Sequence, residues 1–146
     1  MVSLMCSPPK KGDASYDSYW AEYNGIKNTL TQRAALLARE LNTMQGIKCQ
    51  PVQGAMYAFP LIKLPDKYHK HNIECNKKEN RELALDARWA LELLERSGIV
   101  VVPGSGFGQE ANTLHFRTTI LPPTDQMQRM ITAIRDFQKY LYDTYA

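Results

Sequence analysis

Arg117 has the side chain best suited to bind a ligand. It stands between Phe116 and Thr118 in residues 113–120, where apolar and polar side chains alternate as they do in a β-strand. The planar guanidinium of an arginine can hold a carboxylate through two parallel hydrogen bonds, whereas a lysine ammonium cannot. The alternation places Arg117 on the face opposite the apolar residues, so this side chain points either into solvent or into a cleft.

A glycine-rich loop precedes this strand. Glycine occupies three of the five positions from 104 to 108, which indicates backbone that has positive φ angles or that another group approaches closely. The spacing differs from that of a phosphate-binding loop, and a strand rather than a helix follows it. The loop is therefore either a tight connection between strands or part of a site, with the candidate residues Gly104, Ser105, Gly106 and Phe107.

A second candidate segment lies earlier in the chain, where the small residues Gly54 and Ala55 come shortly before Tyr57. Small residues before an aromatic one suit a strand that runs beneath a ligand, and they suit ordinary sheet packing equally well. The segment is therefore kept as a candidate without a definite role.

Several kinds of chemistry are not supported by the residues. The sequence has no Gly-x-Ser-x-Gly motif and no convincing Ser/His/Asp set. His69 and His71 lack further ligands at suitable spacing, so we expect no metal site. The three cysteines are odd in number and form no Cys-x-x-Cys pair, which favours reduced thiols in a cytosol-like compartment. Cys49 is expected in the core.

Composition describes an ordinary globular domain. The 146 residues are 44% hydrophobic and 23% charged, and a chain of this length typically forms one domain. The net charge of +3 is too small, and the basic residues too scattered, to indicate a nucleic-acid partner. No apolar run is long enough for a membrane span, and the first residues do not resemble a signal peptide.

Periodicity predicts the elements that would position these residues. We expect an irregular segment over 1–14 and a helix over 15–45, whose apolar residues recur every three or four positions. Strands follow at 47–50 and 55–59, then a polar loop at 65–80. The remaining elements are a helix at 79–96, strands at 99–102 and 113–120, and a last helix from Thr124. The expected apolar face of the helix at 79–96 is Leu83, Ala87, Ala90, Leu91 and Leu94.

The order αββαββα favours an α/β fold with a two-layer sandwich. Four segments in this order also resemble the C-terminal part of alanine aminotransferases, which are pyridoxal-phosphate-dependent class I aminotransferases of fold type I. They are MVSLMCSPPKKGDASYD at 1–17, GAMYAFP at 54–60, LLERSGIVVVPGSGFG at 93–108 and HFRTTILPP at 115–123. The resemblance implies a small C-terminal domain over 15–146, led by a long interdomain helix at 15–45.

The same resemblance implies roles for the candidate residues. Arg117 would bind the α-carboxylate of an amino acid or 2-oxo acid, and the segments 54–57 and 104–107 would close over the substrate. The full enzyme would be a homodimer that converts L-alanine and 2-oxoglutarate into pyruvate and L-glutamate, in the cytoplasm or the mitochondrion. The family's Schiff-base lysine segment has no counterpart here, so this chain carries no catalytic residue of its own.

The resemblance therefore implies a part of a larger enzyme that is inactive alone. Its partners would be amino acids, 2-oxo acids and the large domain of the same enzyme, which would hold most of the pyridoxal phosphate. We expect the large domain to cover the aromatic residues Tyr16, Tyr19, Trp20 and Tyr23. The alternative is a free-standing module, derived from this domain, that binds 2-oxo acids or serves regulation.

Overall fold

The computed structural model describes residues 6–146, which form two compact units. The first unit ends at Gln32, and the second is Arg33–Ala146. Residues 1–5 of the predicted irregular segment lie outside the described residues, and residues 6–15 contain turns and no helix. Among the described residues, no helix combines the length and the apolar character that crossing a membrane needs.

Aromatic packing is the main feature of the first unit. The helix α2 (Tyr16–Leu41) begins here, and the Tyr19 and Trp20 rings meet edge to face with centroids 5.3 Å apart. The Trp20 indole donates a hydrogen bond to the Pro9 carbonyl over 3.3 Å, while the Tyr19 and Tyr23 rings remain exposed. The expected aromatic cluster is therefore present.

The last turns of α2 belong to the second unit. Ala34, Leu37 and Leu41 are buried, and the helix ends at Leu41 rather than at the predicted residue 45. A tight turn follows, in which Gly46 has a φ of +76° and a Cβ would lie 2.6 Å from the Lys63 carbonyl oxygen. Only glycine suits this position, because both the conformation and the space exclude a side chain.

Within residues 6–146, five short strands form two antiparallel sheets. Strand β1 (Ile47–Lys48) pairs with β3 (Leu61–Ile62). In the other sheet β5 (Phe116–Thr119) lies between β2 (Tyr57–Ala58) and β4 (Val102–Pro103). The sequence pattern does not separate β3 from β2. The division comes at Pro60, which has no N–H donor but whose carbonyl still accepts from the Phe116 amide over 3.1 Å.

The predicted strand at 99–102 is shifted. Strand β4 comprises only Val102 and Pro103, and of the preceding residues Val101 is buried while Val100 is 73% exposed. The run of β-branched residues predicted a fully buried strand, but only alternate side chains face the core. A 3-10 helix, η1 (Gly104–Phe107), then forms the glycine-rich loop.

The prediction of a loop at 65–80 is wrong, because this segment is the helix α3 (Asp66–Glu79). Its buried face is largely polar, so it shows no hydrophobic periodicity. The Arg88 guanidinium from the next helix bonds to Asn72 over 3.3 Å and to Asn76 over 3.0 Å, and it makes an ion pair with Glu79 over 2.8 Å. Arg88 itself is 4% exposed. Buried polar groups need such partners, and here they replace an apolar face.

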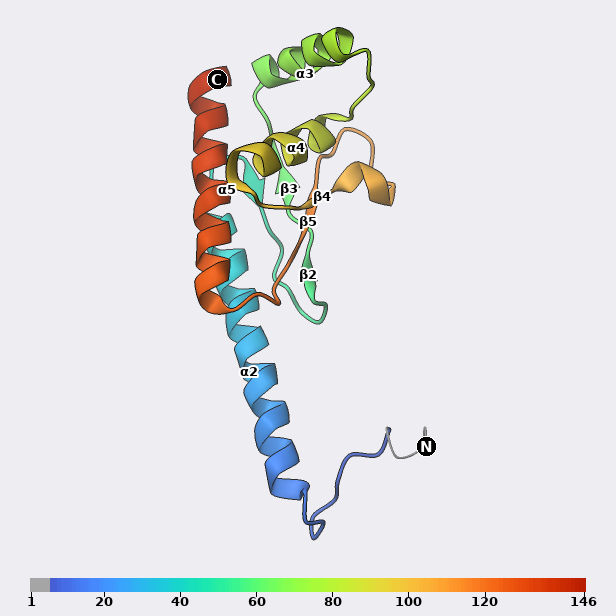
Figure 1. The fold of residues 1–146 in the computed structure, drawn as a ribbon, viewed down its shortest axis with the longest axis vertical. Helices are drawn as coiled ribbons and strands as arrows, with labels where there is room; N and C mark the ends of the chain where they lie inside the picture. The colour runs from blue at the N-terminus through green and yellow to red at the C-terminus, as the bar shows by residue number, and fades with distance from the viewer. Residues whose placement is uncertain (1–5) are drawn as a thin grey trace. The chain divides into compact units, whose positions relative to one another are not determined.

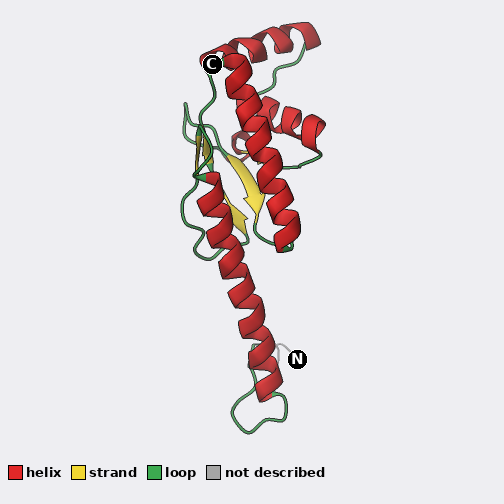
Figure 2. Cartoon of the chain, turned by 90° about the vertical axis from the view of Figure 1, so that its left-hand side faces the viewer, coloured by secondary structure: helices red, strands yellow, loops and turns green. Residues whose placement is uncertain are grey.

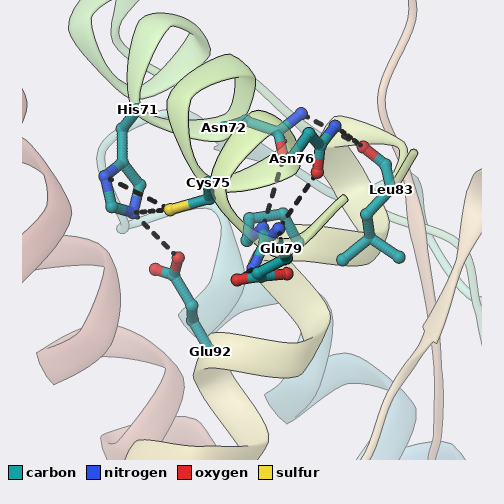
Figure 3. A network of polar contacts seen from close by, with 8 residues as sticks. His71, Asn72, Cys75, Asn76, Glu79, Leu83 and Glu92 are labelled. Atoms are coloured by element: carbon teal, nitrogen blue, oxygen red, sulfur yellow. Dashed lines mark hydrogen bonds and ion pairs between the residues drawn. The ribbon is translucent and has the colours of Figure 1, made fainter. Parts of the chain in front are cut away.

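Figure 3 shows this polar network between the two helices, in which Asn72 and Asn76 point toward Leu83. Both amides donate to the Leu83 carbonyl, over 3.2 Å and 3.0 Å. On the other side of the network His71 Nε2 lies 3.2 Å from a Glu92 carboxylate oxygen. It also lies 3.5 Å from the Cys75 sulfur.

The helix α4 (Leu85–Ser97) begins later than predicted and is capped at its C-terminus by Gly98, which has a φ of +72°. Its predicted apolar face is wrong in part, since Leu94 is exposed and the buried residues are Asp86, Arg88, Trp89, Ala90 and Leu93. The reason is that Trp89 sets the orientation of the helix. Its indole donates to the Gln138 side chain over 3.2 Å, and its ring lies 4.8 Å from that of Phe116.

The core lies where α4 and α5 (Thr124–Tyr145) cover one face of the three-stranded sheet. Both views show α5 running alongside the strands (Figures 1 and 2). The sequence predicts an apolar stripe on this helix, which is buried at Met127, Met130, Ile131, Ile134, Phe137 and Leu141, while its remaining member, Tyr140, is half-buried. The α/β class is thus confirmed, and the observed order contains one strand and one helix more than αββαββα.

Candidate functional site

Arg117 lies on the central strand of the three-stranded sheet. Strand β5 alternates as predicted, because Phe116 and Thr118 are buried against the helices while Arg117 is half-buried on the other face. Val102 of β4 pairs with Arg117. Both edges of β5 are paired, so the strand that carries Arg117 is held from two sides.

Two aromatic rings pack against the Arg117 guanidinium. Its carbon Cζ lies 4.6 Å from the ring centroid of Tyr57 and 4.7 Å from that of Phe107. Tyr57 pairs with Thr119, so it is the diagonal neighbour of Arg117 on the same sheet face. Phe107 comes from the end of η1. The structure therefore brings together three candidate residues from three separate segments.

The guanidinium keeps its capacity to bind an anion. Within residues 6–146 no carboxylate lies within ion-pair distance of Arg117, since every ion pair there involves other residues. The aromatic rings attract the cation through their negative faces but use none of its N–H donors as a carboxylate would. A half-buried arginine with unused donors is suited to an incoming carboxylate.

A groove adjoins this arginine. Its volume is about 360 Å³, and its lining is mainly apolar but includes the polar side chains of Arg117, Thr118, Thr119 and Gln126. Tyr57 also lines it, whereas Gly54 and Ala55 do not. The structure places these two in a bend before β2. A small ligand with one carboxylate and an apolar portion fits this lining.

The glycine-rich loop is anchored at its start. The Gly104 amide donates to the His115 carbonyl over 2.7 Å, and a Cβ at this position would lie 2.8 Å from the His115 Cβ. The Ser105 amide donates to an Asp86 carboxylate oxygen over 2.6 Å. Gly106 faces open space. Of this loop, therefore, Phe107 reaches Arg117, while Gly104 and Ser105 fix the loop backbone.

Sequence analysis missed a set of residues behind the loop. The Gln109 side-chain nitrogen donates to an Asp86 carboxylate oxygen over 3.0 Å, and the His115 Nδ1 lies 3.1 Å from the Gln109 side-chain oxygen. An ionised carboxylate can only accept, so the Gln109 nitrogen faces Asp86 and its oxygen accepts from the Nδ1–H of His115. This assignment fixes the direction of both hydrogen bonds.

Phe59 completes the cluster. Its ring stacks on that of His115, with centroids 4.8 Å apart and planes at 3°, and it meets the Phe107 ring edge to face at 5.8 Å. Strand alternation from Tyr57 could have placed Phe59 on the Arg117 face. Asp86 and Gln109 carried no such signal, because their contacts join residues distant in the sequence.

The groove does not contain the group that would hold pyridoxal phosphate covalently. That cofactor binds through a lysine amine, and no lysine is among the lining residues. The lining includes a guanidinium, which suits a carboxylate, and no amine that could bind the cofactor aldehyde.

Comparison with known proteins relates the chain to aminotransferases at the level of the family profile and of individual sequences. A profile of the family described as "Aminotransferase class I and II" matches residues 6–134. Alanine aminotransferase 2, mitochondrial, from Arabidopsis thaliana is 45% identical over 145 residues, which are 99% of this chain and 26% of that protein. Alanine aminotransferase 2 from Panicum miliaceum is 48% identical over 139 residues, covering 95% of this chain and 28% of that protein.

A solved structure shows the same fold. The alanine aminotransferase from Pyrococcus furiosus superimposes with a TM-score of 0.63 at 26% identity, over 80% of this chain and 25% of that one. The chain thus spans about a quarter of the length of the curated relatives it matches.

Proposed function

The chain belongs to the class I and II aminotransferases, and from this we propose that it supplies the carboxylate-binding arginine of an alanine aminotransferase. The observation that carries the proposal is Arg117, which is half-buried between two aromatic side chains and lies beside a groove. In the proposed reaction, L-alanine and 2-oxoglutarate give pyruvate and L-glutamate. All four carry the α-carboxylate that a planar guanidinium can hold.

The proposed role of the site is to bind and orient. Two parallel hydrogen bonds from Arg117 would fix the carboxylate, and the groove beside it would receive the remainder of the substrate. Fixing one end of the substrate restricts the directions in which its Cα–H bond can point, which lowers the entropic cost of a reaction at that carbon. Tyr57 and Phe107 exclude water from part of the guanidinium and so strengthen its attraction for the anion.

We place the cofactor and the reactive lysine in residues that this chain does not contain. The chain alone would therefore be inactive, and the active form would include an aminotransferase large domain and a second copy of the whole enzyme. We propose the cytoplasm or the mitochondrion as its compartment, since relatives from Arabidopsis and Dictyostelium carry the word mitochondrial in their names.

A chimeric enzyme tests this function. In it, the matching C-terminal residues of the Arabidopsis alanine aminotransferase are replaced by this chain, and transamination of alanine with 2-oxoglutarate is measured. We expect an active chimera in which Arg117→Ala raises the KM for both substrates by roughly a hundredfold, the scale for leaving a buried charge unpaired. Unchanged KM values for both substrates would contradict the assignment of Arg117.

A second experiment separates this function from that of a free-standing module. The purified chain is mixed with pyridoxal phosphate, reduced with borohydride and mapped by mass spectrometry, and pyruvate formation from alanine is assayed in parallel. We expect neither a stoichiometrically labelled lysine nor turnover. A single labelled lysine with turnover would show that the chain has its own catalytic centre. Submicromolar binding of a 2-oxo acid by the chain alone would favour the module.

A further inference from the structure

We propose that Asp86 and Gln109 are positioning residues for carboxylate binding, which hold Phe107 against Arg117 without touching Arg117 themselves. The inference rests on the proposed function of Arg117 and adds two residues that lie behind its site. Their contacts reach the arginine by two routes, one through the backbone of η1 and one through aromatic side chains.

Asp86 is the fixed point of both routes. It lies in the first turn of α4 and is 1% exposed. One carboxylate oxygen accepts from the Ser105 amide over 2.6 Å and from the Gln109 side chain over 3.0 Å, while the other accepts from the Ala87 amide over 2.9 Å. Within residues 6–146 no cation pairs with it. A buried carboxylate depends on such donors, so the donors are held strictly in place.

The first route follows the backbone. Ser105 and Phe107 both belong to the four-residue helix η1, so fixing the Ser105 amide fixes the position from which the Phe107 side chain extends. The preceding residue, Gly104, is held by its bond to the His115 carbonyl. Gly106 and Phe107 themselves are exposed. The loop is therefore held at its start, and its exposed end carries the ring that contacts Arg117.

The second route follows side chains. Gln109 accepts from the Nδ1–H of His115, which fixes the plane of the imidazole. That ring stacks in parallel on Phe59, and Phe59 meets Phe107 edge to face. Each of these contacts constrains the orientation of the next ring. Both routes thus end at the Phe107 ring, which lies 4.7 Å from the Arg117 guanidinium carbon.

The consequence concerns the orientation of the guanidinium. Phe107 is 47% exposed, so few other contacts keep its ring in place. If the anchors are removed, the ring can leave the guanidinium, and the arginine gains rotational freedom that a bound carboxylate must take away again. Loss of either anchor should therefore weaken carboxylate binding although neither anchor touches the carboxylate.

Nuclear magnetic resonance of the full ¹⁵N-labelled chain tests the positioning without any ligand. The Nε–H signal of Arg117, assigned with Arg117→Lys, carries a ring-current shift from Phe107, and Phe107→Leu measures the size of that shift. We expect Gln109→Leu and Asp86→Asn to move the signal in the same direction as Phe107→Leu. Thr113→Val is the matched control, because it removes a hydrogen bond of 2.7 Å in the same loop that lies on neither route.

Titration with 2-oxoglutarate and pyruvate supplies the second measurement. We expect Gln109→Leu to weaken binding by roughly fivefold, the scale of one lost cation–π contact, and Thr113→Val to leave it unchanged. An unmoved Arg117 signal in Gln109→Leu overturns the positioning role whatever the titration shows. A moved signal together with no binding by the unaltered chain supports the positioning and counts against the proposed function. If the buried Asp86→Asn variant does not fold, the half-buried Gln109 position decides.

Discussion

At the scale of single residues, the surroundings of Arg117 separate two properties that usually occur together. The side chain is held in place by aromatic rings at 4.6 Å and 4.7 Å, yet its hydrogen-bonding capacity is not consumed by a carboxylate of residues 6–146. Had an aspartate held it, the arginine would be equally well ordered but already neutralised. Aromatic contacts therefore suit an arginine that must bind an anion reversibly.

Replacement of Arg117 by lysine tests whether the shape of the cation matters or only its charge. Arg117→Lys keeps the positive charge but loses the planar pair of donors. We expect carboxylate binding to fall by roughly tenfold or more, as measured by titration with 2-oxoglutarate. Arg129→Lys, on the exposed surface of α5, serves as the control. Equal affinities for the original chain and Arg117→Lys would mean that charge alone accounts for binding.

The sequence predicted only those site residues whose immediate neighbours in the chain form a recognisable pattern. Alternation placed Arg117 on the face away from the core, and glycine content drew attention to the loop that contains Phe107. The role of Asp86 could not be predicted from the sequence, because an aspartate near a helix start ordinarily caps that helix in solvent. Nothing in the sequence shows that Ser105 and Gln109 donate hydrogen bonds to it. The ligand-binding role of Arg117 itself stays a prediction.

At the scale of elements, η1 shows how two glycines in one short helix differ. A side chain at Gly104 would collide with Gln109 and with His115 Cβ at 2.8 Å, whereas Gly106 has nothing within 4 Å. Gly104 is thus required by close approach, and Gly106 is not. The close approach that the glycine-rich composition indicated is therefore found at Gly104 and not at Gly106.

The two glycines provide a matched pair for measurement. We expect Gly104→Ala to lower the free energy of unfolding by about 1–3 kcal/mol through overpacking. Gly106→Ala should leave it unchanged or raise it by up to about 1 kcal/mol, because the unfolded chain loses freedom. Urea unfolding followed by circular dichroism gives both values. Similar losses in the two variants would show that packing around Gly104 is not the cause.

Helix α3 shows why hydrophobic periodicity fails to predict some helices. Its buried residues are Tyr68 and Asn72, and Asn72 and the half-buried Asn76 bind the buried Arg88. Hydrophobic periodicity detects helices that bury apolar faces, and a helix that buries amides looks like a solvated loop. Charges near its ends, with Asp66 in the first turn and lysines in the last, fit the helix dipole and were the remaining signal.

The ion pair between α3 and α4 makes stability depend on acidity. The hydrogen bond from Arg88 holds the pKa of Glu79 below its ordinary value of 4.5. A carboxyl group with a lowered pKa stabilises the folded state at pH values above 4.5, and this contribution disappears as the pH falls through the folded-state pKa. We expect the free energy of unfolding to drop less between pH 6 and pH 3 in Glu79→Gln than in the original chain.

Urea unfolding at both pH values measures this difference. Glu74→Gln is the control, because Glu74 is an exposed carboxylate of the same helix and makes no ion pair among the described residues. An acid sensitivity of Glu79→Gln equal to that of the original chain would show that the pair does not stabilise the fold.

At the scale of the whole molecule, burial is distributed unevenly along the chain. Within residues 6–146, every buried apolar residue lies at or after Ala34, while α2 runs from Tyr16 to Leu41 through the boundary after Gln32. One helix thus contains a stretch that packs into a core and a stretch stabilised by its own hydrogen bonds and by the aromatic cluster. The sequence predicted a continuous helix correctly, because the apolar stripe has the same period in both stretches.

Hydrogen exchange can resolve the two stretches of α2. We expect amides of residues 22–30 to exchange at least roughly tenfold faster than those of residues 37–41, since only the latter share the global stability of the core. Mass spectrometry of peptides from the exchanged chain gives the ratio. Uniform protection along α2 would mean that the first stretch is covered in solution. Sedimentation would then show whether a second copy of the chain covers it.

The alternation along β5 has a consequence for how faithfully the chain folds. A slip of one residue in the pairing of a strand moves every side chain to the opposite face. In β5 such a slip would carry the Arg117 charge into the space of Phe116 and Thr118, beneath Trp89, and would expose an aromatic ring. Isolating a charge there would cost far more than the pairing gains. The residue proposed to recognise substrate therefore also disfavours pairing of β5 in a register shifted by one residue.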